Sequence, residues 1–297
     1  MVDHSDATYL QPSATTPNAR SALIACITLA TAGVAFAVII WFGFLGAGPS
    51  AYKLLPVNHG IYPVGVADAA QPSGMAPPGP NAIKGYRLAY VNDFLGSTLP
   101  TGWDAFSGVP GGDPGGQFGA NHAIVRNGML QLLTAKDPAY NMRWVTGGVC
   151  QCGLASTYGA YFVRSRVTGA GPNEVELLWP ADNQWPPEID FNESGGSLNS
   201  SSSTIHFSAV NEIDQRSILI SMSQWHTWGV IWTPKSVSYV VDGQVWGTIT
   251  TPSEISRIPM TLDLEQRSRC ASGYQCPAHP VDMDVDWVAE YHAIPKS

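Results

Sequence analysis

The chain has 297 residues and carries 15 Lys and Arg against 23 Asp and Glu, for a formal net charge of −8. Charged residues make up 13% of the chain, about half of the roughly 25% found in ordinary soluble domains. Hydrophobic residues make up 44%, and this balance excludes both a charge-rich disordered chain and a coiled coil. No block of Lys and Arg is present, so no nucleic-acid partner is expected.

Residues 21–45 form an uncharged segment in which Ala22–Leu45 is apolar apart from two threonines. At 1.5 Å per residue its 24 residues extend over ~36 Å as a helix, which exceeds the ~30 Å hydrocarbon core of a bilayer. We expect a transmembrane signal-anchor at 21–45, preceded by a cytoplasmic tail at 1–20. A cleaved signal peptide is the alternative, since Gly46-Ala47-Gly48 offers small residues. The length of the apolar stretch and the tail before it favour the anchor.

Four cysteines lie beyond this segment, and their even number indicates an oxidising compartment. They are Cys150, Cys152, Cys270 and Cys276, for which three disulfide pairings are open. A zinc site is the alternative, but the spacings Cys-x-Cys and Cys-x5-Cys do not match the common Cys-x2–4-Cys at both ends. We therefore expect a single-pass protein of the cell membrane with most of the chain outside the cytoplasm, or a secreted protein if the N-terminal segment is cleaved.

Residues 46–84 are rich in Pro, Gly and Ala and predict an extended linker. Residues 85–297 are predicted to form one all-β domain of two stacked antiparallel sheets, because short β-branched and aromatic runs recur between turn signals. Asn127-Gly128 and Asp242-Gly243 each predict a hairpin turn. The expected strands are Arg87–Phe94, Met129–Thr134, Ala160–Val167, Glu174–Trp179, Thr204–Ser208, Ser217–Ser221, Thr227–Trp232, Ser236–Val241, Met260–Leu264 and Met283–Tyr291.

Three acidic residues fall within six positions, at Glu188, Asp190 and Glu193. On a regular strand Glu188 and Asp190 point to one face, and Ile189 and Phe191 point to the other. Glu193, five positions after Glu188, would then point to the opposite face. A β-bulge at Phe191–Asn192 would return it to the face of the other two carboxylates. The segment therefore predicts three carboxylates in one row on a solvent-facing surface.

Two carboxyl groups about 5–5.5 Å apart can hydrolyse a glycosidic bond with retention, one as nucleophile and one as acid. Four strand steps separate the backbones of Glu188 and Glu193 by roughly 13 Å, so their side chains must lean toward each other. A solvated acidic face and a calcium site are the alternatives. Trp185 and the Gly195-Gly196 turn favour a sugar site, because aromatic faces stack on sugar rings and glycine permits close approach.

The segment Glu188–Glu193 resembles the E-x-D-x-x-E strand of glycoside hydrolase family 16, the laminarinase and β-glucanase group. Weaker matches follow in the family's order and extend over about Tyr86–Tyr291. The resemblance implies a concanavalin-like β-jelly-roll fold, which here would follow a single N-terminal transmembrane helix. The weaker matches include Tyr90–Phe94, Asn127–Leu130, Tyr158-Gly159, His206, Trp225–Trp228, Trp232, Asp242-Gly243 and Val285–Trp287.

By this resemblance Glu188 is the nucleophile, Glu193 the general acid and base, and Asp190 the residue that tunes the pair. Trp185 would stack on a sugar next to the cleaved bond, and His206 would contact substrate near Glu193. Trp179 and Gln266 are further candidates for substrate binding. Five other tryptophans are expected in the core, namely Trp103, Trp144, Trp225, Trp228 and Trp246.

The chain departs from the family pattern in two places. Where many members have Tyr-Gly-x-Phe-Glu-x-Arg, residues 158–164 read Tyr-Gly-Ala-Tyr-Phe-Val-Arg, so an acidic residue is missing. The segment Val175–Trp179 replaces the common Trp-Pro-Ala-Phe-Trp. The four cysteines are not general family features, and they would staple two loops at the edges of the strands. These departures bear on the substrate rather than on the chemistry.

The sequence thus predicts a retaining endo-glycosidase that cleaves internal β-linkages of a polysaccharide, most simply β-1,3- or β-1,3-1,4-glucan. A transglycosylase that remodels a wall or exported polysaccharide is one alternative, and a non-catalytic carbohydrate-binding protein is another. No cofactor or catalytic metal is expected, and a structural calcium ion is not indicated. The expected partners are the polysaccharide and the membrane, and the expected state is a monomer.

Overall fold

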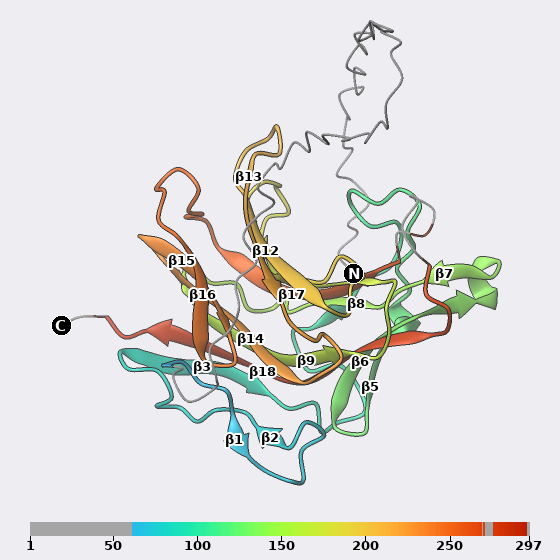
Figure 1. Cartoon of the computed structure of the whole chain (residues 1–297), viewed down its shortest axis with the longest axis horizontal. Helices are drawn as coiled ribbons and strands as arrows, with labels where there is room; N and C mark the ends of the chain where they lie inside the picture. The colour runs from blue at the N-terminus through green and yellow to red at the C-terminus, as the bar shows by residue number, and fades with distance from the viewer. Residues whose placement is uncertain (1–60, 269, 271–275, 296–297) are drawn as a thin grey trace, which may run out of the picture.

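Strands account for nearly all regular structure in the computed structural model, which describes residues 61–268, 270 and 276–295 (Figure 1). One group of strands comprises β4 (Asp104–Ala105), β8 (Gly148–Cys150), β10 (Asn173–Pro180), β11 (Glu188–Glu193), β12 (Ser200–His206), β13 (Ile213–Leu219) and β17 (Met260–Arg267). They form a seven-stranded sheet in the order β13-β12-β11-β10-β17-β8-β4.

A second group forms a nine-stranded sheet, whose main path is β16-β15-β14-β9-β18-β6-β5, with β3 beside β18 and β7 beside β6. Its strands are β3 (Tyr86–Asn92), β5 (Ala123–Arg126), β6 (Met129–Asp137), β7 (Arg143–Val145), β9 (Gly159–Val167), β14 (His226–Thr233), β15 (Ser236–Val241), β16 (Gln244–Ile249) and β18 (Val281–Ala293). Pairing between neighbouring strands is antiparallel throughout both sheets. The predicted sandwich of two antiparallel sheets is confirmed.

Each of the ten predicted strands overlaps an observed one, and β15 matches its predicted range. β12 and β13 are displaced most, each by four residues at its start. β12 begins at Ser200 rather than Thr204 because its four serines pair fully with β13. Serine lacks the β-branched side chain on which the prediction relied. The two hairpin turns are confirmed, since both residues of Asn127-Gly128 and of Asp242-Gly243 have positive φ between paired strands.

The core lies between the two sheets, where alternate residues of facing strands meet. It includes Phe191 and Ile189 of β11, Val230 and Trp228 of β14, and Leu262 of β17. Of the five tryptophans expected in the core, Trp103, Trp228 and Trp246 are buried. Trp144 and Trp225 are instead half-buried, and each contacts a cation, Lys136 and Arg166 respectively.

Residues 61–84 pack against the outer face of the nine-stranded sheet, and they contain a small ribbon of β1 (Val66–Ala67) and β2 (Met75–Ala76). The Trp287 indole donates to Met75 O at 2.9 Å, and the Tyr291 hydroxyl donates to Pro78 O at 3.0 Å. Ile83 also joins an apolar cluster with Trp287 and Tyr291. The prediction of an extended linker is therefore wrong for this part of 46–84, because its backbone and apolar groups are bound to the sheet.

The predicted tail, the predicted membrane anchor at 21–45 and the first part of the predicted linker lie outside the described residues. Within residues 61–268, 270 and 276–295, no helix has the length and apolar character needed to cross a membrane. The helical turns there are short 3-10 segments, η3 (Ala120–His122) and η4 (Pro138–Tyr140).

Two disulfides join the four cysteines in local pairs. Cys150 at the end of β8 is bonded to Cys152, with their Cα atoms 5.0 Å apart. Cys270 is bonded to Cys276, with Cα atoms 4.9 Å apart. Of the three pairings left open by the sequence, the structure has the one in which each bond closes a single loop.

Because residues 61–84, here called the strap, are bound to the sheet, the folded unit extends upstream of residue 85. We expect a chain that begins at Gly85 to unfold with a free energy roughly 3–5 kcal/mol below that of a chain that begins at Ile61, because Trp287 and Tyr291 become exposed. Urea denaturation of the two chains measures this difference. Equal midpoints would show that the strap adds no stability.

Candidate active site

The site is built on β11, whose hydrogen-bond register contains one extra residue. Against β12, Asp190 pairs with Thr204, whereas Glu193 pairs with Ser202, so three steps on β11 oppose two on its neighbour. Against β10, Asp190 pairs with Leu177 and Asn192 pairs with Glu176, which leaves Phe191 unpaired. The predicted β-bulge is confirmed on both sides of the strand.

The bulge sorts the side chains of β11 onto the two faces of the seven-stranded sheet. Ile189 and Phe191 point inward and belong to the hydrophobic core. Glu188, Asp190 and Glu193 lie on the outer face, with the two glutamates half-buried and Asp190 buried. The row of three carboxylates expected from the sequence is therefore present, because the extra residue restores the parity of Glu193.

Glu188 contacts Trp185, which lies three residues before it in the sequence. The Trp185 indole donates to Glu188 Oε2 at 2.8 Å, and its ring lies 6.0 Å from the ring of His206. Continuing the register of β10 and β11 beyond Leu178 and Ile189 places Trp179 beside Glu188 on the outer face. Both predicted aromatic residues therefore lie next to this carboxylate.

Asp190 forms an ion pair with His206 of β12, whose Nε2 lies 3.2 Å from Asp190 Oδ2. Burial and the neighbouring Glu188 raise the pKa of the Asp190 carboxyl well above its usual range, and His206 opposes this shift. Burial lowers the pKa of His206, but the hydrogen bond and charge of Asp190 outweigh it and raise that pKa to about 9. Asn211, whose Oδ1 lies 2.6 Å from His206 Nδ1, orients the ring from the other side.

Glu193 is held by a residue that sequence reasoning missed. Asn173 at the start of β10 donates from Nδ2 to Glu193 Oε1 at 2.8 Å, and its own Oδ1 accepts from Gly195 N. The Glu193 amide donates to Ser201 Oγ of β12 at 3.1 Å. No spacing in the sequence could have identified Asn173 or Asn211, because each reaches its partner only through strand pairing or a loop.

β17 extends the acidic surface across the sheet. Asp263 and Glu265 face outward, and Glu265 forms an ion pair of 2.5 Å with Arg267. Burial raises the pKa of Asp263 well above its usual range, and the charge of Glu265 adds to this. These residues were not expected from the sequence. The outer face therefore carries more buried acid than the motif alone indicates.

Gln266 does not belong to this surface. It pairs with Glu174 on the inner side of the seven-stranded sheet, is fully buried, and hydrogen-bonds Thr134 of β6 in the opposite sheet at 2.8 Å. The expectation that Gln266 contacts substrate is therefore corrected by strand parity, since it is one residue out of step with the outward-facing Glu265.

Glu188, Asp190 and His206 bring three potential ligand atoms within 4.8 Å of one another, as do Asp104, Cys150 and Cys152. In the first group, both His206 nitrogens already contact side chains, namely Asp190 and Asn211. In the second, the two sulfur atoms are bonded to each other. The imidazole of the first group and the two sulfur atoms of the second are thus already engaged within the protein.

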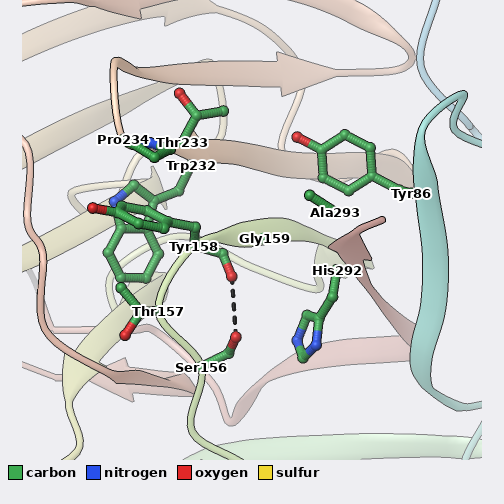
Figure 2. Close-up of a pocket in the computed structure, with 10 residues that line it drawn as sticks. All are labelled: Tyr86, Ser156, Thr157, Tyr158, Gly159, Trp232, Thr233, Pro234, His292 and Ala293. Carbon is green, nitrogen blue, oxygen red and sulfur yellow. Dashed lines mark hydrogen bonds between the residues drawn. The ribbon is translucent and has the colours of Figure 1, made fainter. Parts of the chain in front are cut away.

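Two hollows are lined by residues outside the carboxylate row. One of about 340 Å³ is lined by residues of β3, β14 and β18 and by the segment 156–159, and Figure 2 shows Ser156 Oγ donating to Tyr158 O beside Trp232. None of its ten lining residues is acidic. The other, of about 360 Å³, is bounded by Pro186, Pro187, Phe207 and residues 252–258. Neither contains the paired carboxylates that glycoside hydrolysis requires.

A β-sandwich with three carboxylates on one bulged strand has the groups for acid–base and nucleophilic chemistry on a glycosidic bond. The family model for glycosyl hydrolases family 16 matches residues 116–288. The chain belongs to this family. It is 27% identical over 184 residues to the endo-1,3-1,4-beta-glycanase ExsH of Rhizobium meliloti, a match that covers 58% of this chain and 40% of that protein.

Solved structures share the fold at lower identity. The non-specific endo-beta-1,3(4)-glucanase SCLam superposes with a TM-score of 0.63 at 21% identity, over 71% of this chain and 93% of that one. The endo-beta-1,3-glucanase from Pyrococcus furiosus superposes with a TM-score of 0.59 at 19% identity, over 71% and 96% of the two chains. At these identities the likeness establishes the fold alone.

The Asp190–His206 pair makes a testable contribution to stability. Since the pKa of His206 rises from 6.5 to about 9 on folding, the stabilisation is fully present below pH 6.5 and is lost as pH rises through 9. At pH 6 we expect the free energy of unfolding of wild type to exceed that of His206→Asn by on the order of 2 kcal/mol, after allowance for the partial exposure of the ring. The difference should fall to near zero by about pH 9.5 in urea denaturation, because His206 is then neutral and no longer forms an ion pair with Asp190. A difference that does not change with pH would contradict the ion pair.

Proposed function

We propose that this protein is a retaining endo-glycosidase that cleaves internal β-linkages of a polysaccharide, with Glu188 as nucleophile and Glu193 as general acid and base. The observation that carries the proposal is the bulge in β11, which puts both glutamates on one outer face with Asp190 between them. Retaining hydrolysis requires such a pair of carboxyl groups on one side of the scissile bond.

In the first step the Glu188 carboxylate bonds to the anomeric carbon, the glycosidic C–O bond breaks, and Glu193 gives its proton to the departing oxygen. In the second step Glu193 takes a proton from water, the water oxygen bonds to the anomeric carbon, and Glu188 leaves. Each role has a supporting contact. Trp185 donates to Glu188, which orients the nucleophile, and Asn173 donates to Glu193. Asp190 keeps a high pKa beside Glu188, so it can share a proton with the nucleophile.

We infer that the substrate is an uncharged β-glucan with β-1,3- or mixed β-1,3-1,4-linkages. The similarity to an endo-1,3-1,4-beta-glycanase and to the endo-beta-1,3(4)-glucanase SCLam supports this class. The surface charge supports it too, because the outward-facing cations on the described strands of the seven-stranded sheet are Arg267 and His206, and both are ion-paired. An anionic glycan would meet net negative charge there. Trp179 and Trp185 offer aromatic faces for sugar rings.

Removal of the nucleophile gives the decisive test. We expect Glu188→Gln to lower kcat on laminarin and lichenan by at least about a thousand-fold, because an amide cannot form the glycosyl–enzyme bond. Reducing-end release measures the rate, and NMR of the first products should show the β-anomer from wild type.

Glu212→Gln is the matched control, since Glu212 is exposed in the loop after β12 and lies off the carboxylate row. It should retain wild-type rates. Wild-type activity in Glu188→Gln, or an initial α-anomer, would overturn the assignment. Products longer than the donor would identify a transglycosylase, and binding without turnover would identify a carbohydrate-binding protein.

We further propose that residues 21–45 anchor the chain in the cell membrane, with the hydrolase domain on the extracytoplasmic side. The uncharged run from Ser21 to Tyr52 and the two disulfides support this location. Full-length protein should fractionate with membranes, and protease added to intact cells should remove the domain. Recovery from the medium of a chain that starts near Ala47 would contradict the anchor and support a cleaved signal peptide.

A further inference from the structure

Directly behind the carboxylate row, two more glutamates lie in the interior between the sheets. Glu174 and Glu176 of β10 are fully buried, and they belong to the segment around Val175–Trp179 in which this chain departs from the family pattern. Their shared partner is Ser165 of β9, in the opposite sheet. Ser165 Oγ lies 2.5 Å from Glu176 Oε1 and 3.2 Å from Glu174 Oε1.

Counting hydrogens shows that this cluster must hold at least one carboxyl proton. A hydroxyl has one hydrogen, so Ser165 can donate to only one of the two carboxyl groups. Its contact with the other requires that carboxyl to donate its own proton to Ser165 Oγ. Asn192 Nδ2 donates to Glu174 Oε1 at 3.3 Å, which makes Glu174 the acceptor and Glu176 the proton donor.

The same cluster is connected to the backbone of Glu193. Asn192, which contacts Glu174 through its amide nitrogen, accepts from Ser201 Oγ at 2.6 Å through its Oδ1. Ser201 Oγ in turn accepts from the Glu193 amide at 3.1 Å. Asn192 also pairs with Glu176 across the two strands, at the position where the bulge ends. A continuous hydrogen-bonded path therefore runs from Ser165 in one sheet to Glu193 in the other.

We propose that Glu174 and Glu176 share protons through Ser165 and act as positioning residues for Glu193, so that loss of these protons at alkaline pH loosens the bulge and lowers activity. The inference rests on the proposed function for its kinetic readout. It assigns the alkaline limit of activity to groups that never touch substrate.

The surroundings of the pair supply nothing to neutralise a negative charge. From β17 the facing side chains are Gln266 and Leu264, and from β18 Val285 lies beside Ser165. The titratable group on this side of β14 is His226, which is ion-paired with Asp242 at 2.6 Å. Burial raises the pKa of Glu174 to about 8, and burial together with the charge of Glu174 raises that of Glu176 further. Ionisation of the pair therefore introduces uncompensated charge just above neutral pH.

The kinetic test compares Glu174→Gln with Glu290→Gln on laminarin from pH 5 to 10. Glu290 is a matched control, because burial also raises its pKa to about 8 but its side chain lies on β18, outside the path to Glu193. We expect Glu174→Gln to move the alkaline midpoint of kcat upward by about one pH unit, with KM within about two-fold of wild type. Glu290→Gln should leave the midpoint unchanged.

Ser201→Ala is the second variant, which breaks the path while leaving both glutamates in place. We expect it to lower kcat about five- to ten-fold across the whole pH range, with little change in KM. An unmoved alkaline midpoint in Glu174→Gln, an equal shift in both glutamine variants, or wild-type kcat in Ser201→Ala would each overturn the proposal.

A measurement without substrate separates this inference from the proposed function. In wild type the backbone amide resonance of Glu193 should titrate with a midpoint near pH 8, and Glu174→Gln should abolish that titration whereas Glu290→Gln preserves it. If wild type hydrolyses no glycan but shows this titration, the proposed function fails and the proton-sharing pair stands. If the amide does not respond to pH near 8, the pair does not position Glu193.

Discussion

The extra residue at Phe191 is the constraint on which the rest of the site depends. Strand geometry allows only two directions for a side chain, so a carboxylate five positions after Glu188 would point into the core of a regular strand. The bulge adds one step, and Glu193 emerges on the same face as Glu188 and Asp190. Burial of Ile189 and Phe191 against the opposite sheet holds this arrangement, because a slip in register would bury three acids and expose two large apolar side chains.

Acidic groups are buried on both faces of the seven-stranded sheet at β10 and β11, and their charge is compensated differently on the two faces. On the outer face, Asp190 is paired with His206 and Glu265 with Arg267, so the charges of these two carboxylates are offset by cations. On the inner face, Glu174 and Glu176 make hydrogen bonds to Ser165 and Asn192 through their Oε1 atoms, whereas the Oε2 atom of each is buried without a hydrogen-bond partner. A carboxyl group in that setting remains neutral most easily by keeping its proton. β11 therefore lies between ion-paired carboxylates on the outer face and protonated carboxyl groups, those of Glu174 and Glu176, on the inner face.

The strap at residues 61–84 shows how composition can mislead about packing. Its content of Pro, Gly and Ala is typical of extended linkers, and it contributes little regular structure. It is bound all the same, because the outer face of the nine-stranded sheet offers Trp287 and Tyr291 as hydrogen-bond donors to backbone carbonyl groups. A segment of low propensity becomes ordered when a partner surface satisfies its backbone, and the partner lies some 200 residues further along the chain.

Local features of the sequence were enough to predict the sandwich, the two hairpin turns, the strand of the carboxylates and its bulge. Side-chain alternation, turn chemistry and the parity of three acids are all properties of neighbouring residues. The tertiary structure alone decided which residues support that strand. Asn173, Asn211 and Ser201 reach their partners through strand pairing or loop closure, and Gln266 is turned inward by the register between β10 and β17. The pair of Glu174 and Glu176 was likewise hidden, since its partner Ser165 belongs to the other sheet. Contacts between strands depend on register and on the meeting of two sheets, and neither is encoded in the order of adjacent residues.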